Sequence, residues 1–449
     1  GEAYRGLSQS LRMSLESSLW YGGLGGAAAV LCIDWGVVHI PEKAELLQDA
    51  WAWLLSVAPA TELAVYFLVP YAAYYMFTLL FMQFIYDKTL ETGGHMPRNL
   101  KNRYTHSGRV PAPYPNGWFV VGLSSELERG DVKQVSILGK EFALFRGQGD
   151  GKVHVVDAFC PHLGANLAID GKVENNCITC PFHGWSFEGE TGKCVNIAYS
   201  KKIPSAAKVG KRPVLERNGS IYMWYHCNGE EPSWEVPEYE GIGTWAVRPD
   251  GFSRHEISAH IQEVPENGAD VAHLNYLHTS PVVHFLGYFG ITHYWSATWA
   301  PLSGKNSHVA QIELTQCLQF LGRWQVPGTA LDVSIKQFGP GVVILQFNSK
   351  VGRFYIVQSV TPLEPMRQQV IHSVYSPWFV PRIVGKGLLW SVVDQVERDI
   401  PIWNNKTYRP SPLLANGDGR IGQFRRWFSQ FYTEEVRAEA REKTSILDW

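Results

Sequence analysis

The chain has 449 residues, enough for two or three domains, and 45% of them are hydrophobic, so large cores are possible. The net charge is −2 and lysine and arginine are not clustered, which argues against nucleic acid as a partner. Seven scattered cysteines form no secreted disulfide framework, so a reducing compartment is expected for the globular part.

The first 90 residues are predicted to form a membrane anchor. Residues 63–86 carry no charged side chain and are long enough to cross a bilayer as a helix. A long buried core helix is the alternative interpretation. Residues 19–40, interrupted by Asp34, predict either a second span or a re-entrant segment. Basic residues flank both outer ends, which predicts a hairpin whose two ends lie in the cytosol.

Residues 91–110 are predicted to be a linker, because glycines and prolines recur over residues 88–116. Short β-strand patterns follow and predict a small β-sandwich domain over residues 111–230. The expected strands are 117–123, 134–138, 141–145, 152–157 and 220–226.

Residues 231–449 are predicted to form an α+β catalytic domain. Alternating hydrophobic stretches predict a curved antiparallel sheet of the helix-grip type. These stretches cover 254–264, 308–320, 331–348 and 353–361. Helices are expected at 265–277, 385–405 and 424–445.

Two cysteine–histidine pairs lie in the predicted sandwich: Cys160 with His162, and Cys180 with His183. The pattern is C-x-H, 17 residues, then C-x-x-H. Two cysteines and two histidines suit a Rieske 2Fe-2S cluster, in which imidazoles replace two thiolates on one iron. A structural zinc site is the alternative, but its pairs usually hold two ligands of one kind. Mixed pairs therefore favour the Rieske cluster.

A second group of possible metal ligands lies on the helix expected at 265–277. Asp270 and His273 are three residues apart and share a helical face. His278 is five residues beyond His273, which is off that face unless the helix ends between them. Two histidines and one carboxylate form the facial triad of non-haem ferrous oxygenases. This pattern predicts a mononuclear Fe(II) site that binds O2.

Residues 160–194 resemble the Rieske family along their whole length. The extra cysteines of respiratory-chain Rieske proteins are replaced here by Ala165 and Phe182, so the resemblance is to Rieske oxygenases. The pattern D/E-x3-D-x2-H-x4-H of that family is met from Glu266 to His278. The resemblance implies that His273 and His278 bind iron and that Asp270 bridges to a cluster histidine of the next subunit. It also implies a polar role near the iron for Asn267.

The third iron ligand must come from elsewhere in the chain. The resembling steroid-hydroxylating branch carries an acid three residues before an I/V-x-W element, and Asp399 occupies that position. Glu397 and Asp394 are alternatives, as is a solvated helix face without a ligand. The sequence therefore favours Asp399 but leaves the choice of carboxylate open.

Two iron sites and the absence of a dinucleotide or flavin motif imply a separate reductase that draws on NADH or NADPH. The whole arrangement resembles the Neverland-type cholesterol 7-desaturases, including residues 112–118 and 397–406. This resemblance implies a C7–C8 double bond introduced into cholesterol. The Asp270 bridge of the resembling oxygenase family implies a ring, expected to be a homotrimer. The protein is expected in the endoplasmic reticulum membrane with the catalytic part in the cytosol. Hydroxylation of another steroid or apolar substrate is one alternative, and a membrane-tethered electron carrier is another.

Overall fold

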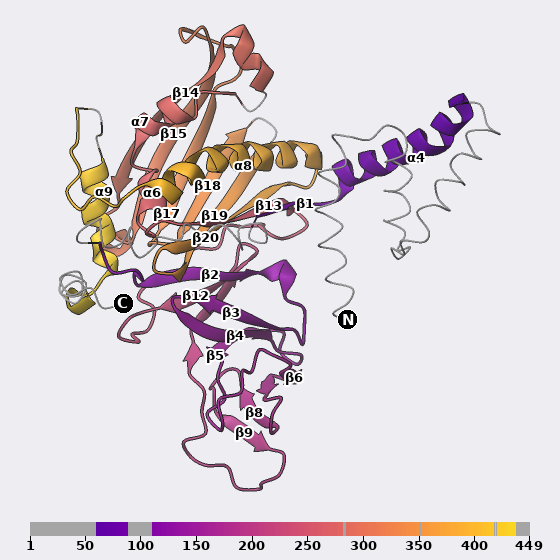
Figure 1. Ribbon diagram of the computed structural model, residues 1–449, viewed down its shortest axis with the longest axis vertical. Helices are drawn as coiled ribbons and strands as arrows, with labels where there is room; N and C mark the ends of the chain where they lie inside the picture. The colour runs from indigo at the N-terminus through magenta and orange to yellow at the C-terminus, as the bar shows by residue number, and fades with distance from the viewer. Residues whose placement is uncertain are drawn as a thin grey trace. The chain divides into compact units, whose positions relative to one another are not determined.

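The computed structural model describes residues 60–88, 110–281, 284–349, 352–416, 418 and 420–436. The chain divides into two units, with the boundary between Met82 and Gln83. The described part of the first unit is helix α4 (Ala60–Phe81), followed by Met82. The second unit contains the strands of the predicted sandwich and of the C-terminal sheet (Figure 1).

The predicted membrane span at 63–86 is wrong at its C-terminal end. Helix α4 stops at Phe81, and strand β1 (Phe84–Asp87) pairs in parallel with β13 (Val247–Ile257). The backbone groups of β1 are used in sheet pairing, so a continuous helix cannot include them. Among the described residues, no helix is long and apolar enough to span a bilayer. The second candidate, 19–40, and the linker up to residue 109 lie outside the described residues.

The predicted β-sandwich is present as two sheets with a third, smaller sheet beyond them (Figure 1). One sheet has the order β11-β12-β2 and the next has the order β10-β5-β4-β3. The small sheet, β6-β7-β8-β9, shares a buried core with β4 and β5, and this core includes the two motif cysteines. The bounds are β2 (Gly117–Leu123), β3 (Val132–Ile137), β4 (Lys140–Arg146), β5 (Val153–Asp157), β6 (Lys172–Glu174), β7 (Cys177–Thr179), β8 (Trp185–Glu188), β9 (Cys194–Ile197), β10 (Lys211–Arg212), β11 (Val214–Arg217) and β12 (Ser220–Tyr225). The 3-10 turn η2 (Ser124–Glu126) follows β2.

The C-terminal domain contains the predicted antiparallel sheet, with strand order β1-β13-β20-β19-β18-β17-β15-β14 and β16 paired to β15. Strand β1 alone among these described strands pairs in parallel. Because β1 precedes the sandwich in sequence and β13 follows it, the sandwich is inserted between two neighbouring strands of this sheet. The remaining bounds are β14 (Ile291–Pro301), β15 (Val309–Phe320), β16 (Trp324–Gln325), β17 (Leu331–Phe338), β18 (Val342–Ser349), β19 (Gly352–Glu364) and β20 (Arg367–Pro377).

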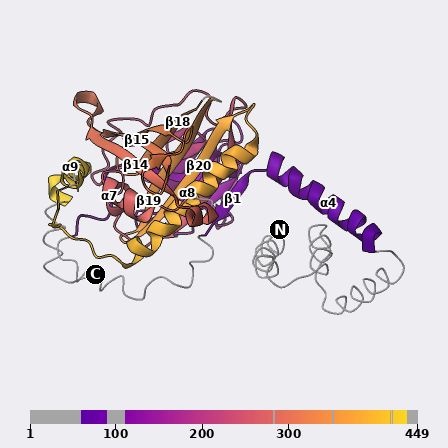
Figure 2. The ribbon, with the colours of Figure 1, turned by 90° about the horizontal axis from the view of Figure 1, so that it is seen from above.

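Helices cover one face of this sheet. Helix α8 (Arg382–Asn405) packs on β13 and β20, and both views show it against the sheet (Figures 1 and 2). It buries Leu389, Val393 and Trp403 against the sheet. Their spacing corresponds closely to whole turns of a helix, so the three side chains share one face. The other helical segments are α6 (Glu263–Glu266), α7 (Val271–Leu277), α9 (Ile421–Phe428), η3 (His284–Phe289), η4 (Gly304–Asn306) and η5 (Ser429–Phe431).

Four expected elements differ from those observed. The helix expected at 424–445 begins earlier, as α9 at Ile421, and ends at Phe428, where the 3-10 turn η5 follows; residues beyond 436 lie outside the described part of the chain. The stretch 331–348 is two strands, β17 and β18, because Gly339 adopts a left-handed φ of 61° and turns the chain. The expected strand at 254–264 is β13, which begins at Val247 and ends at Ile257, where its pairing with β20 ends. The helix expected at 265–277 is broken into α6 and α7, since Asp270 has an extended backbone.

Candidate metal centres

The first centre lies on two similar loops, one between β5 and β6 and the other between β7 and β8. In each loop the backbone closes on its cysteine: the N–H of Gly164 donates to the carbonyl of Cys160 at 2.9 Å, and that of Gly184 to Cys180 at 3.1 Å. Both glycines have positive φ, 78° and 67°, so side chains are disfavoured there. The two turns therefore bring the four motif side chains to one end of the domain.

The donor set in these loops fits a Rieske cluster. The rings of His162 and His183 are 4.7 Å apart and nearly perpendicular, and the thiols of Cys160 and Cys180 are buried next to each other. Burial raises the pKa of Cys160 to about 11, so a thiolate there needs a bound cation. Among the described residues, the buried Nδ1 of His183 has no hydrogen-bond partner, as expected of a metal-binding nitrogen.

Trp185 covers one side of this centre. Its indole stacks on the His162 ring at 4.7 Å with an interplanar angle of 8°, and its Nε1 donates to the hydroxyl of Tyr199 at 3.0 Å. An indole fixed in this way keeps water from one imidazole. The position agrees with a shielding role for Trp185.

The second centre brings together His273, His278 and Asp399, whose ligating atoms all lie within 4.8 Å of one another. The His278 Nε2 is 3.2 Å from the Asp399 Oδ1, and the two imidazole rings are 5.3 Å apart at 81°. Adjacent ligands about 2.1 Å from one metal ion, at right angles, are separated by about 3 Å, and the distance between His278 and Asp399 is close to that value. His278 and Asp399 are buried and His273 is partly buried.

The five-residue spacing of the histidines is accommodated because α7 ends between them. Leu277 is the last helical residue, and His278 is the C-cap, with φ −103° and ψ 28°. At the other end, the Asp270 carboxylate caps α7 by accepting from the His273 N–H at 3.2 Å. The ring of His273 also points its Nδ1 at the backbone carbonyl of Asp270. If Nδ1 donates to that carbonyl, Nε2 is left with a lone pair for metal binding.

Burial lowers the pKa of His273, although Asp399 and Asp270 oppose the shift. The neutral imidazole, which is the metal-binding form, is therefore favoured at neutral pH.

The two alternative carboxylates, Glu397 and Asp394, are paired with other side chains. Glu397 pairs with Lys88 at 2.5 Å and accepts from the hydroxyl of Tyr86. Asp394 pairs with Arg398 at 2.7 Å and with His284 at 3.2 Å. Asp399 is thus the acid of this segment that lies with the two histidines.

Two residues that sequence reasoning did not single out hold His278 in place. The Trp295 indole on β14 donates to the His278 carbonyl at 3.0 Å. The side-chain amide of Asn275 on α7 makes two bonds to the Trp295 backbone, accepting from its N–H at 2.9 Å and donating to its carbonyl at 2.7 Å. These bonds tie the end of α7 to the sheet. A single asparagine and a tryptophan 20 residues apart give no sequence signal of this arrangement.

The remaining predicted site residues lie at the break between α6 and α7. Asn267 is the C-cap of α6, and its role near iron stays a prediction. Glu266, the first acid of the family pattern, is held by the guanidinium of Arg425 at 2.6 and 2.9 Å.

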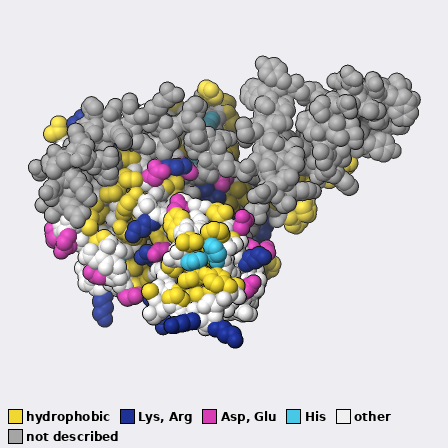
Figure 3. Space-filling model, turned by 60° about the horizontal axis from the view of Figure 1, so that its bottom comes forward, with side chains coloured by type: hydrophobic (Ala, Val, Ile, Leu, Met, Phe, Trp, Pro, Cys, Tyr) yellow, Lys and Arg dark blue, Asp and Glu magenta, His cyan; other side chains and the backbone are white. Residues whose placement is uncertain are grey.

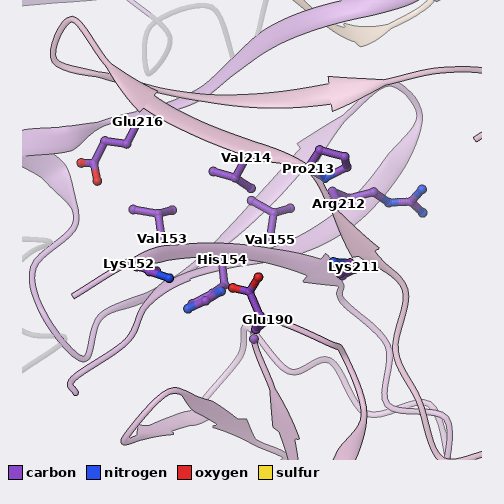
Figure 4. Close-up of a pocket in the computed structure, with 11 residues that line it drawn as sticks. Lys152, Val153, His154, Val155, Glu190, Lys211, Arg212, Pro213, Val214 and Glu216 are labelled. Carbon is purple, nitrogen blue, oxygen red and sulfur yellow. The ribbon is translucent and has the colours of Figure 1, made fainter. Parts of the chain in front are cut away.

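A cavity of about 310 Å³ lies in the sandwich domain (Figure 4). His154 and Glu190 lie on one side of it and Val214 on the other, and Arg212 and Glu216 are already paired with Asp157 and Arg146. None of the candidate metal ligands lines this cavity.

Comparisons with known proteins place these features in a family. The profile of the Rieske [2Fe-2S] domain matches residues 117–207, and that of the 3-ketosteroid 9alpha-hydroxylase C-terminal domain matches residues 223–432. The fold resembles dicamba monooxygenase (TM-score 0.54, 19% identity, 73% of this chain and 98% of that one). It also resembles the terminal oxygenase of carbazole 1,9a-dioxygenase (TM-score 0.51, 18% identity, 76% and 97%). The fold and the two centres define a Rieske oxygenase, with a 2Fe-2S cluster, a mononuclear iron, O2 and reductase-supplied electrons.

Sequence relatives narrow the assignment. The chain is 43% identical over 360 residues to the cholesterol 7-desaturase of Xenopus laevis (78% of this chain, 79% of the relative) and 41% identical over 366 residues to that of Caenorhabditis elegans (76% and 84%). A probable 3-ketosteroid-9-alpha-monooxygenase oxygenase component of Rhodococcus rhodochrous is 31% identical over 358 residues (74% and 84%). The chain belongs to the cholesterol 7-desaturase family of Rieske oxygenases, which confirms the family predicted from its motifs.

Proposed function

We propose that this chain introduces the C7–C8 double bond into cholesterol and releases 7-dehydrocholesterol. The sterol loses two hydrogen atoms, NADH or NADPH supplies two electrons through a separate reductase, and one O2 is reduced to two waters. The observation that carries this proposal is the 40–43% identity to relatives named cholesterol 7-desaturase, over about three quarters of the chain. The gathered set of His273, His278 and Asp399 supports an oxygenase rather than an electron carrier.

Each site residue has a proposed role. Cys160, His162, Cys180 and His183 would hold the cluster, and His273, His278 and Asp399 would hold the iron. When bound, the cluster supplies single electrons and the iron supplies the reaction with O2. The Asp270 carbonyl orients His273 through Nδ1, and the Asp270 carboxylate caps α7. We retain Asn267 as a polar neighbour of the iron.

The working unit is proposed to be a head-to-tail homotrimer in which Asp270 links the His273 centre of one subunit to a cluster histidine of the next. Exposed apolar side chains surround the histidines at the cluster end, including Leu163 and Phe182 (Figure 3). Tyr276 on α7 is also largely exposed. A head-to-tail contact would bury both surfaces, and such a contact must close into a ring to avoid a filament.

We also propose that the protein is attached to the endoplasmic reticulum membrane with its catalytic part in the cytosol. Support comes from helix α4, whose described side chains beyond Leu68 are mostly apolar and exposed, and from the bilayer location of a sterol substrate. Alkaline carbonate extraction of membranes tests attachment: the chain should stay in the pellet, and release into the supernatant would contradict it.

The test of the reaction is expression of the chain, with a reductase, in cells fed labelled cholesterol. A labelled 7-dehydro product is expected, and it should disappear in His273→Ala. A hydroxylated sterol in its place would favour the second candidate, steroid hydroxylation, which the 31% identical 3-ketosteroid monooxygenase relative supports. The iron content separates the electron carrier, which has two iron atoms per chain, from an oxygenase, which has three.

A further inference from the structure

A set of exposed apolar side chains lies at the start of α8 and beside it. We name it the aromatic surface: Ile85, Trp245, Trp378, Phe379, Ile383 and Trp390. The exposed fractions of its tryptophans are 78% for Trp245, 56% for Trp378 and 51% for Trp390. Exposing several large apolar side chains in one patch to water is energetically unfavourable, and such patches mark interaction sites.

The members of the aromatic surface are connected. The ring of Trp378 is 6.3 Å from that of Trp245 and 5.9 Å from that of Phe379. Ile383 and Trp390 are seven residues apart on α8, which is two helical turns, so they share one face. The Trp390 ring is 6.2 Å from Phe84, the residue before Ile85. The surface therefore runs from the turn after β20, along α8, to the edge strand β1.

The turn that presents Trp378 and Phe379 is held firmly. The Trp378 N–H donates to the Ala246 carbonyl at 3.0 Å, and the guanidinium of Arg248 donates to the carbonyls of Trp378 and Val380. These bonds fix the turn to β13, so the exposure of the rings belongs to the folded scaffold.

Positive charge accompanies the apolar side chains. Arg248 and Arg382 lie 3.6 and 3.7 Å from the buried carboxylate of Asp250. The positive charge of Lys386 also acts on this carboxylate. Three cations thus share one carboxylate. Burial lowers the pKa of Lys386, and the neighbouring Arg382 lowers it further. Three cations around one carboxylate leave a net positive charge beside the aromatic surface, which suits a negatively charged partner.

We propose that the aromatic surface docks on a phospholipid bilayer, with its rings in the headgroup layer and its cations on anionic lipids. This inference rests on the proposed sterol substrate, which is dissolved in the bilayer. Protein surfaces that contact a membrane–water interface typically combine tryptophan with basic residues. Two residues separate the end of the apolar helix α4 from the start of strand β1, so this edge adjoins the proposed membrane-attached segment in sequence.

The surface also shares a helix with the iron site. Trp390 and Asp399 are nine residues apart on α8, a distance of about 14 Å along the axis. Docking would therefore bring the bilayer within a sterol's length of the iron ligands. A sterol could pass from the membrane to the site without crossing bulk water.

Lipid cross-linking tests the docking without reference to turnover. The full chain is reconstituted in phosphatidylcholine–phosphatidylserine vesicles that contain a photoactivatable phospholipid, and cross-linked peptides are identified by mass spectrometry. Lipid adducts are expected at Trp245 and within residues 378–390. Adducts confined to residues before Gln83 would overturn the proposal. Cross-links that join the surface to a second copy, or to another segment of the chain, would also overturn it.

An activity comparison supplies the second test. The double variant Trp378→Ser/Trp390→Ser should lower kcat/KM for vesicle-embedded cholesterol by about tenfold or more, because two large apolar side chains no longer insert. Its activity on cyclodextrin-delivered cholesterol should be unchanged. Trp324→Ser on β16, where the tryptophan is 58% exposed, is the matched control and should keep both activities.

The outcomes are distinguishable. An equal loss with both forms of delivery would assign Trp378 and Trp390 to the fold and overturn the docking proposal. If the unsubstituted protein makes no 7-dehydro product with either delivery, the proposed reaction fails, while the cross-linking result still decides whether the surface meets lipid.

Discussion

Replacing Trp295 by phenylalanine should weaken iron binding without removing any ligand. The indole N–H donates to the carbonyl of His278 at 3.0 Å, and both residues are buried. Phenylalanine keeps an apolar ring but leaves that carbonyl without its donor, at a cost of about 1–3 kcal/mol. When this cost destabilises the arrangement of His278 that binds iron, the affinity for ferrous iron should fall about tenfold or more. Losses of this size are typical when a residue that hydrogen-bonds to a metal ligand is removed.

The assay is ferrous iron affinity, measured by competition with a chelator, with the spin-resonance signal of the reduced cluster as an internal control. The cluster signal should be unchanged, since the cluster ligands lie on other loops. Asn275→Leu should have a similar effect, because it removes both bonds that fix the Trp295 backbone to α7.

Trp299→Phe is the matched control. Trp299 is buried on the same strand, β14, and within the described residues its indole Nε1 has no hydrogen-bond partner. The two substitutions remove similar volumes, so they differ mainly in the bond to His278. Equal iron affinities in the two variants would refute the reasoning, since the change would then reflect packing alone.

Three further predictions concern the ligand set, electron transfer and pH. Asp399→Ala should lose the mononuclear iron and keep the cluster. Glu397→Ala should keep both metals, because Glu397 forms an ion pair with Lys88. The reverse pattern of iron contents would show that Glu397, and not Asp399, is the ligand. Asp270→Asn should retain both metals but leave the cluster reduced in a single turnover with O2 and substrate, and mixing it with Cys160→Ser chains should restore activity; a fully active monomer would contradict this. Burial lowers the pKa of His372 to about 3, so the folded state excludes a proton that the unfolded chain takes up below about pH 6.5. The free energy of unfolding should therefore fall by about 1.4 kcal/mol per pH unit for this group as pH drops from 6.5 towards 3. His372→Phe should flatten that slope in urea titrations, and an unchanged slope would assign the acid sensitivity to other groups.

The local chemistry of both centres could be predicted from the sequence. Cys160, His162, Cys180 and His183 lie in two short turns, and the spacing within each turn is set by the chain itself. Asp270 and His273 are one helical turn apart, so their proximity is also local. The alternation of apolar residues predicted an antiparallel sheet, although a hairpin at Gly339 was hidden inside one continuous stretch.

Contacts between distant segments could be decided only by the tertiary structure. Asp399 reaches His278 across more than a hundred residues, and three acids of one helix were open candidates until their partners were known. The pairing of β1 with β13 cannot be read from an apolar run, because such a run suits a membrane helix, a core helix or a strand equally. The same holds for Trp295, whose bond to His278 depends on the register of β14 against α7. Spacing along the chain specifies which ligands can be near neighbours, whereas burial and pairing across the sheet determine which of the remaining candidates meet them.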